Sequence, residues 1–178
     1  MKMANEELNR KFDAEKSVLK VLKSLNYEFV KSLGQGRIGS VIEVKCPYCK
    51  QTIAIKIVME EDLMENELKI WTRLSHPNIV NLISSNYIDA ARSYIFLMKK
   101  CVTSLEHRLG DPGFIFDRQA FQKATLWIKG VLEGINHLHE QSYAHMDLKM
   151  NNVLIDEEEN ALVADFDSLT STEKMITT

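Results

Sequence analysis

The spacing of apolar side chains predicts a long helix early in the chain and another in its second half. Residues 4–25 repeat apolar positions at helical spacing, and their stripe consists of Leu8, Phe12, Leu19, Leu22 and Leu25. Residues 118–139 carry a main stripe of Phe121, Ala124, Ile128, Leu132 and Ile135, and a second shoulder of Ala120, Trp127, Val131 and Leu138. Because this apolar surface is broader than a surface helix requires, we expect helix 118–139 to be buried on more than one side.

Short apolar runs between turn residues predict strands, and these runs cover residues 27–33, 41–44, 52–58, 79–84 and 93–98. A charged helix is expected over 60–74. It should end before His76-Pro77, because the residue before a proline avoids the helical conformation. Residues 153–155 and 161–164 predict a hairpin that turns through the acidic run DEEEN, which we interpret as solvated. Strands therefore dominate the first half and helix the second, which predicts an α+β fold.

The composition is that of a globular protein with a real core, because 45% of the 178 residues are hydrophobic and 26% are charged. A formal net charge of -3 disfavours nucleic acid and anionic membranes as partners. Residues 1–16 alternate in charge without the apolar core of a secretory signal, and no apolar run has the length of a membrane span. With only three Cys and no export signal, we expect no disulfide framework and a cytoplasmic or nuclear location.

A glycine-punctuated segment, LGQGRIGSV at residues 33–41, follows one predicted strand and leads into another. This context argues against a dinucleotide-binding fold, in which the glycines open a helix. Between strands, glycines can form a tight flap whose backbone N–H groups approach a polyphosphate without a Cβ in the way. An ordinary glycine-rich hairpin is the alternative interpretation.

Lys56 closes the apolar strand AIK. Its ammonium could simply reach water, as strand-end lysines usually do. The functional interpretation is a fixed cation for phosphates, which needs a carboxylate partner. Glu67 on the following predicted helix is the candidate, and Glu65 is its nearest rival on a different helical face.

The segment HMDLKMNN, residues 145–152, supplies further polar groups at fixed offsets. Asp147 could accept a hydroxyl proton, Lys149 could neutralise a transferring phosphoryl, and Asn152 could bind Mg²⁺. Asp165, at the end of the predicted hairpin, would be the principal metal ligand. Each residue alone could be a turn or capping group. That alternative weakens because all of them occur in order.

Together the motifs GxGxxGxV, AIK, a helical Glu before HPNIV, HxDLKxxN and DF-x resemble the eukaryotic protein kinase family. The resemblance covers residues 27–169 in the family's order and spacing. It implies a protein-kinase-like fold with a β-rich N-lobe at 27–98, followed by a hinge and partial helical C-lobe at 99–178. Residues 1–26 would be a helical extension, and ATP would bind between the lobes.

The resemblance also implies roles for single residues. Lys56 and Glu67 would form an ion pair, Asp147 with Lys149 would belong to the catalytic loop, and Asn152 and Asp165 would bind Mg²⁺. The implied ATP-binding set is Gly34, Gly36, Gly39, Val41, Ala54, Lys56, the gatekeeper Met98, and the backbone of the hinge from Lys99 to Cys101. The DLKxxN form resembles Ser/Thr kinases more than Tyr kinases.

The chain departs from the family pattern in ways that keep a second function open. Met146 replaces the arginine before the catalytic Asp, which suggests control by a route other than activation-loop phosphorylation. Asp167 replaces the glycine of DFG, and it could add a metal ligand or weaken the active conformation. The sequence stops at Thr178 without an APE motif or later helices, so we expect a fragment, a truncated form or a module completed by a partner. The alternative to a protein kinase acting on protein substrates is therefore a weak or inactive module that docks onto another kinase.

The segment CPYC, residues 46–49, has the form of a glutaredoxin-like redox site. Such sites lie at a helix N-terminus, whereas this segment falls in a predicted hairpin turn. A single CxxC is also half of a zinc site at best. From the sequence, we therefore interpret it as a decorated turn.

Overall fold

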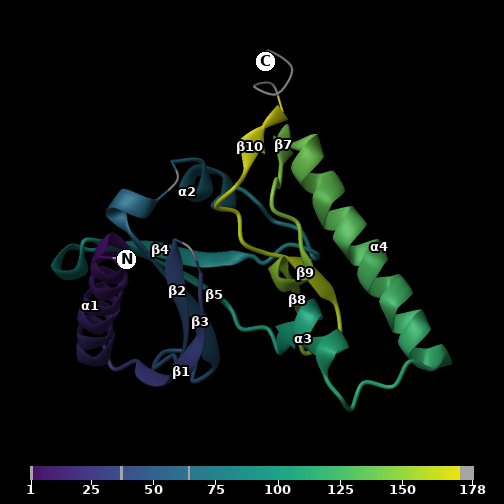
Figure 1. Ribbon diagram of the computed structural model, residues 1–178, viewed down its shortest axis with the longest axis horizontal. Helices are drawn as coiled ribbons and strands as arrows, with labels where there is room; N and C mark the ends of the chain where they lie inside the picture. The colour runs from purple at the N-terminus through teal and green to yellow at the C-terminus, as the bar shows by residue number, and fades with distance from the viewer. Residues whose placement is uncertain (1, 37, 64, 173–178) are drawn as a thin grey trace. The chain divides into compact units, whose positions relative to one another are not determined.

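The computed structural model describes the backbone of residues 2–36, 38–63 and 65–172, and the side chains of residues 7–36, 38–63 and 68–172. The chain forms two compact units (Figure 1). The first consists of Met1–Leu63 and Leu82–Lys100, and the second of Met64–Asn81 and Cys101–Thr178. No helix within the described ranges is long and apolar enough to cross a membrane.

The first unit is built on a five-stranded antiparallel sheet with the strand order β1-β2-β3-β5-β4. The strands are β1 (Glu28–Gln35), β2 (Gly39–Lys45), β3 (Thr52–Met59), β4 (Leu82–Ile88) and β5 (Ser93–Lys99). Short 3₁₀ turns follow two of them, η1 (Glu60–Asp62) and η2 (Asp89–Ala91). Four of the predicted strands are confirmed, but the one expected at 79–84 begins later, at Leu82. Ile79 instead forms an isolated parallel bridge with Val163 in the second unit.

Helix α1 (Lys2–Ser24) packs on one face of this sheet, so the predicted helix is confirmed. Its buried side chains are Ala14, Val18 and Leu22, spaced four residues apart. Val18 and Leu22 join a core with the β-branched residues of the strands, Ile42, Val44, Ile53, Ile55, Ile57 and Ile95 among them. The predicted stripe was therefore partly wrong, because its members Leu8, Phe12 and Leu25 are exposed.

The second unit is largely helical. Its helices are α2 (Glu65–Trp71), α3 (Leu105–Gly110) and α4 (Arg118–Glu140), with a 3₁₀ turn η3 (Met150–Asn152). Its strands form one small sheet of β6 (Thr103–Ser104), β8 (Val153–Ile155) and β9 (Ala161–Val163), and another of β7 (Tyr143–Ala144) and β10 (Thr170–Ser171). The predicted β8–β9 hairpin is confirmed. The helix expected over 60–74 is shorter, because extended backbone at Leu63 separates η1 from α2.

Helix α4 is buried on one side only, so the expectation of burial on several sides was wrong. The buried side comprises Ala120, Trp127, Gly130, Gly134 and Leu138. The expected main stripe is largely exposed, and Phe121, Ile128 and Leu132 keep 75%, 62% and 63% of their surface. A Cβ at Gly130 would lie 2.5 Å from Asn78 Nδ2, and one at Gly134 would lie 2.6 Å from the Asn78 carbonyl oxygen. The helix therefore packs through its glycines, which allow this close approach.

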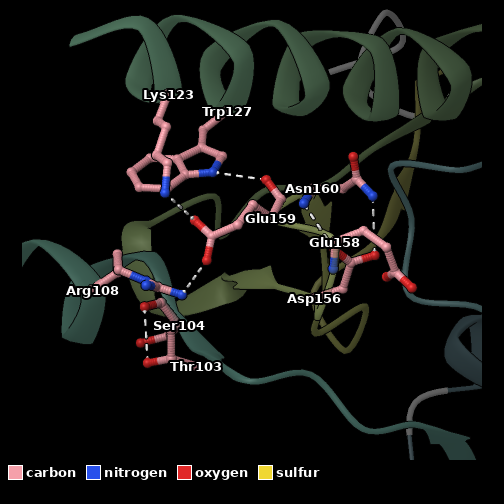
Figure 2. Close-up of polar contacts among 9 residues, drawn as sticks. All are labelled: Thr103, Ser104, Arg108, Lys123, Trp127, Asp156, Glu158, Glu159 and Asn160. Carbon is pink, nitrogen blue, oxygen red and sulfur yellow. Dashed lines mark hydrogen bonds and ion pairs between the residues drawn. The ribbon is translucent and has the colours of Figure 1, made fainter. Parts of the chain in front are cut away.

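The turn between β8 and β9 is an ordered structure rather than a simply solvated run (Figure 2). Asp156 is buried, and its Oδ1 accepts hydrogen bonds from the backbone N–H groups of Glu158 and Asn160 at 3.0 and 2.8 Å. Its Oδ2 accepts a further bond from Asn160 Nδ2 at 3.2 Å. A short acidic side chain that bonds the backbone ahead of it is the usual way to fix such a turn.

Glu159 ties the same turn to two helices (Figure 2). Its carboxylate lies 2.7 Å from Arg108 of α3 and 3.4 Å from Lys123 of α4. Its carbonyl oxygen accepts a 3.0 Å hydrogen bond from Trp127 Nε1. The hairpin that precedes Asp165 is thereby held in place from both sides.

Candidate active site

The glycine-rich segment forms the turn of the β1–β2 hairpin. Gly34 pairs with Val41 in the strand register, and the Gly36 N–H donates a 2.8 Å hydrogen bond to the Gly39 carbonyl. A Cβ at Gly39 would lie 2.2 Å from the Ile57 carbonyl oxygen, so packing against β3 requires this glycine. A Cβ at Gly34 would meet no atom of the described chain within 4 Å. Packing therefore accounts for a glycine at position 39. At position 34 it does not, because a side chain there would find open space.

The strand register gathers predicted ATP-binding residues on one face of the sheet. Val41 lies opposite Lys56, and Ala54 lies opposite Met98. Directly opposed residues in antiparallel strands point to the same face. Side chains at alternate positions point the other way, and those of β2, β3 and β5 form the core with α1. Lys56 is only 7% exposed, so it is a buried side chain on the face away from α1 and not a strand-end lysine that reaches water.

An ion pair on this same face was missed by the sequence reasoning. Glu43 lies opposite Ala54 and is 4% exposed, and its Oε1 lies 3.0 Å from Lys100 Nζ. Its Oε2 is buried and has no hydrogen-bond partner among the described residues. Lys100 belongs to the predicted hinge segment. The available signal was a charged residue at an inward position of the apolar strand Val-Ile-Glu-Val.

The carboxylate expected to pair with Lys56 lies outside the described residues. Glu67 is part of helix α2, but its side chain and that of its rival Glu65 are not among those described. The Lys56–Glu67 ion pair therefore stays a prediction.

In the second unit, His145 anchors the segment that carries Asp147. The imidazole is buried, its Nε2 lies 2.9 Å from the Ala164 carbonyl oxygen, and its Nδ1 accepts a 3.3 Å bond from the Asp147 N–H. These partners assign the ring hydrogen to Nε2, because Nδ1 must act as the acceptor. His145 therefore has a structural role, because its ring bonds the backbone beside Asp165.

The side chains of Lys149 and Asn152 converge on the carboxylate of Asp147. Lys149 Nζ lies 2.7 Å from Asp147 Oδ2. Asn152 Nδ2 donates to the Asp147 carbonyl oxygen at 2.9 Å and to the same Oδ2 at 3.1 Å. The Lys149 hydrogen bond, aided by its charge and by Asn152, lowers the pKa of Asp147 from its ordinary value. Asp147 is therefore an ionised carboxylate at neutral pH, and its Oδ1 takes no part in these bonds.

Asp165 is held beside this group by its neighbours. The Ala164 N–H donates a 2.9 Å bond to the Asn152 carbonyl oxygen, and Asp165 itself adopts a left-handed backbone with φ 65°. The next residue, Phe166, is fully buried, and its ring contacts those of Trp71 and His145 at centroid distances of 5.5 and 5.8 Å. Residues other than glycine rarely adopt a positive φ. Such a conformation persists where the surrounding structure fixes the backbone.

The charge of Asp165 also acts on Lys149, a residue of the predicted catalytic loop. The hydrogen bond to Asp147 is the main cause of the raised pKa of Lys149, and the charges of Asp147, Asp165 and Asp167 add to it. Lys149 therefore stays protonated among three carboxylates. Asp167, at the position of the DFG glycine, contributes to this negative field.

The predicted ligands Asn152 and Asp165 carry the oxygen donors that Mg²⁺ prefers. Both amide hydrogens of Asn152 are used on Asp147, so its amide oxygen is the atom left for a cation. Among the described side chains, no group of three or more His, Cys, Asp and Glu could hold a metal by itself. Mg²⁺ bound with phosphates needs only one or two protein carboxylates, so the predicted ligands Asn152 and Asp165 are compatible with such a site.

Residues 27–177 match the family model of the protein kinase domain. A probable cyclin-dependent kinase 9 from Caenorhabditis elegans is 29% identical over 156 residues, covering 79% of this chain and 32% of that protein. A calcium/calmodulin-dependent protein kinase type 1 from Macrobrachium nipponense is 34% identical over 127 residues, covering 65% of this chain and 35% of that protein. A cysteine-rich receptor-like protein kinase 37 from Arabidopsis thaliana is 35% identical over 157 residues, covering 79% of this chain and 23% of that protein.

The chain thus spans about a third or less of the length of these curated relatives. The family match nevertheless covers the glycine-rich hairpin, Lys56, the Asp147 segment and Asp165 in one stretch. The motifs, the five-stranded antiparallel sheet and the geometry around Asp147 agree with it. The chain belongs to the eukaryotic protein kinase family.

Proposed function

We propose that this domain binds Mg-ATP and transfers the γ-phosphoryl group to a serine or threonine hydroxyl of a protein. The observation that carries the proposal is the Asp147 carboxylate, held ionised by Lys149 and Asn152 next to the Asp165 segment. Phosphoryl transfer of this kind depends on positioning and on neutralising charge, and these residues supply both. The Ser/Thr preference rests on the resemblance of the DLKxxN segment.

The role proposed for each residue follows from the chemistry of its side chain. Asn152 and Asp165 would hold Mg²⁺, which neutralises charge on the phosphates when it is bound with ATP. Lys56, buried on its sheet face, offers a fixed cation for the phosphates. Val41, Ala54 and Met98 give that face an apolar surface for a nucleobase.

Asp147 would orient the acceptor hydroxyl and accept its proton. Oδ2 of Asp147 is bonded to Lys149 and Asn152, so Oδ1 is the oxygen that would accept the proton. The lowered pKa makes Asp147 a weak base, which suits a group whose main work is orientation. Lys149 keeps its proton, so it can neutralise charge beside the transferring phosphoryl.

The test is phosphoryl transfer from γ-labelled ATP to mixed peptide libraries that contain Ser/Thr or Tyr as the only acceptors. The chain should label the Ser/Thr library, and Asp147→Asn should lower the rate by about 10²-fold or more. Asp89→Asn, an exposed aspartate in η2, is the matched control and should keep the rate. Labelling of the Tyr library alone would contradict the Ser/Thr assignment. Equal rates for wild type and Asp147→Asn would contradict the role of Asp147.

A second function, a binding module that docks onto another kinase, is favoured by the departures at Met146 and Asp167. Met146 is 58% exposed in a left-handed backbone with φ 63°, at the position of an arginine in the family pattern. A module of this kind would co-purify with a partner kinase. Its effect on that partner would be unchanged by Asp147→Asn, which separates it from the enzyme.

A further inference from the structure

A buried carboxylate lies on the sheet face that carries the predicted ATP-binding residues. Glu43 of β2 is buried, and the strand register sets it opposite Ala54, which in turn lies opposite Met98. Ala54 and Met98 belong to the apolar surface proposed for the nucleobase. Glu43 therefore lies beside that surface, within the first unit.

The stability of the fold alone does not account for this glutamate. Burial of a carboxylate is costly, and a well-packed apolar side chain in its place is often neutral or stabilising. The cost is greater here because Oε2 is buried without a hydrogen-bond partner among the described residues. The charge is compensated by Lys100, whose Nζ donates a 3.0 Å hydrogen bond to Oε1. The role of Glu43 must therefore be sought in its effect on Lys100.

Lys100 stands where the chain leaves the first unit. Strand β5 ends at Lys99, which pairs with Ile53, so Lys100 lies beyond the last pair of this ladder. The chain passes into the second unit between Lys100 and Cys101. The backbone from Lys99 to Cys101 is the predicted hinge, which would contact adenine. The ion pair therefore fixes the hinge to β2 at a point beyond the reach of the strand ladder.

A second ion pair of β2 shows what is particular to this one. Lys45 lies 3.5 Å from Glu28 of β1, and both of these side chains are exposed. Exposed pairs contribute little, because water screens the charges and the long side chains lose freedom when they pair. Glu43 is buried, so its attraction for Lys100 is screened less. The buried pair can hold the backbone in place, and the exposed pair serves as its control.

We propose that Glu43 is a positioning residue for nucleotide binding, which acts by holding Lys100 and thereby the hinge backbone that receives the adenine of Mg-ATP. This inference rests on the proposed ATP-binding function and adds a residue to that site. Glu43 acts through Lys100 and not by touching the nucleotide, because its own side chain is covered in the folded unit.

The experiment compares the dissociation constant of Mg-ATP, measured by calorimetry, with the amide hydrogen-exchange protection of the β2–β3 ladder in the nucleotide-free chain. Glu43→Leu removes the carboxylate and leaves Lys100 free to reach water, so ladder protection should stay at the wild-type level. The dissociation constant should nevertheless rise about fivefold or more, because the hinge loses its attachment to β2. Loss of a negative charge would by itself favour ATP, so a weaker affinity points to the hinge.

Three further variants complete the test. Lys100→Met should raise the dissociation constant similarly and also lower ladder protection, because Glu43 is then buried without its cation. Lys100→Arg keeps the charge and the hydrogen-bond donors, so it should bind Mg-ATP more tightly than Lys100→Met does. Lys45→Met removes the exposed pair and should change neither measurement. Should Glu43→Leu lose protection, Glu43→Gln keeps the size of the side chain and takes its place.

The outcomes separate this inference from the function on which it rests. Wild-type ATP affinity in a well-protected Glu43→Leu or Glu43→Gln chain would overturn the proposal, because the pair would then serve stability alone. Equal loss of affinity in Lys100→Arg and Lys100→Met would overturn it too. A wild-type chain that binds no Mg-ATP would overturn the proposed function itself, and the inference with it.

Discussion

Replacing Gly39 by alanine should destabilise the first unit, whereas the same change at Gly34 should not. At Gly39 the new methyl group would lie 2.2 Å from the Ile57 carbonyl oxygen on β3. That is roughly 1 Å closer than an ordinary carbon–oxygen contact. The obstacle is backbone, so β2 and β3 must separate, and overpacking of this kind costs about 1–3 kcal/mol. At Gly34 the methyl group meets no described atom within 4 Å, so the change should stay within about 0.5 kcal/mol.

The assay must report on the first unit. Both tryptophans, Trp71 and Trp127, belong to the second unit, so their fluorescence would follow the wrong part of the chain. Amide hydrogen exchange of the β2–β3 ladder under native conditions measures the free energy of opening where the clash occurs. Gly39→Ala should lose protection along this ladder, and Gly34→Ala should match the wild type. Equal protection in the two variants, or a larger loss in Gly34→Ala, would refute the packing argument.

The same pair separates folding from ligand binding. Because Gly34→Ala keeps the sheet intact, any loss of ATP affinity in this variant reflects the space above the hairpin and not unfolding. We expect its ATP dissociation constant, measured by calorimetry, to rise severalfold. An unchanged constant would show that the phosphates do not approach the backbone at Gly34.

Two other predictions concern the second unit. Asp156→Ala removes the acceptor of three hydrogen bonds in the β8–β9 turn and should cost about 1–3 kcal/mol. Urea unfolding followed by tryptophan fluorescence suits this variant, because Trp127 bonds the same turn, and exposed Glu157→Ala is the control that should show no change. Lys149→Ala removes the main cause of the lowered pKa of Asp147, so that pKa should rise toward its ordinary value. Because the folded pKa is lowered in the wild type, the contribution of Asp147 to stability is present above the ordinary carboxyl pKa and is lost as pH falls through the lowered value. Titration of the Asp147 carboxyl by carbon NMR measures the shift, and an equal or lower pKa in Lys149→Ala would show that the ion pair is absent in solution.

Local sequence patterns predicted the elements better than their packing. Short apolar runs between turn residues located β1, β2, β3 and β5. The strand expected at 79–84 was displaced because Ile79 is used in the bridge to Val163. A contact of that kind joins segments distant in sequence and leaves no local signal.

The buried faces of the helices were predicted poorly for a physical reason. Hydrophobicity favoured Phe121, Ile128 and Leu132 on α4, yet the buried side contains Gly130 and Gly134. The glycine side of α4 is buried because only a residue without a side chain can lie so close to Asn78. A prediction based on hydrophobic residues gives glycine no weight. On α1, the smaller side chains Ala14 and Val18 are likewise buried, whereas Leu8 and Phe12 are exposed.

For the candidate site, the order and spacing of motifs identified Asp147, Lys149 and Asn152, and these side chains do converge. The sequence did not predict that Lys149 and Asn152 share one oxygen of Asp147, because that depends on the conformation of the loop. The Glu43–Lys100 pair was also missed, since its partners are far apart in sequence and meet only through the sheet register.

The most direct test of the central claim is the thermal stability of the chain with and without Mg-ATP. A ligand at about 100 times its dissociation constant stabilises a protein by about 2.7 kcal/mol, which corresponds to an increase of about 5–10 °C in Tm for a chain of this size. We predict this increase for the wild type with Mg-ATP but not with Mg²⁺ alone, and a smaller increase for Lys56→Ala and for Asp165→Ala. A well-folded wild-type sample whose Tm does not change with Mg-ATP would contradict the account.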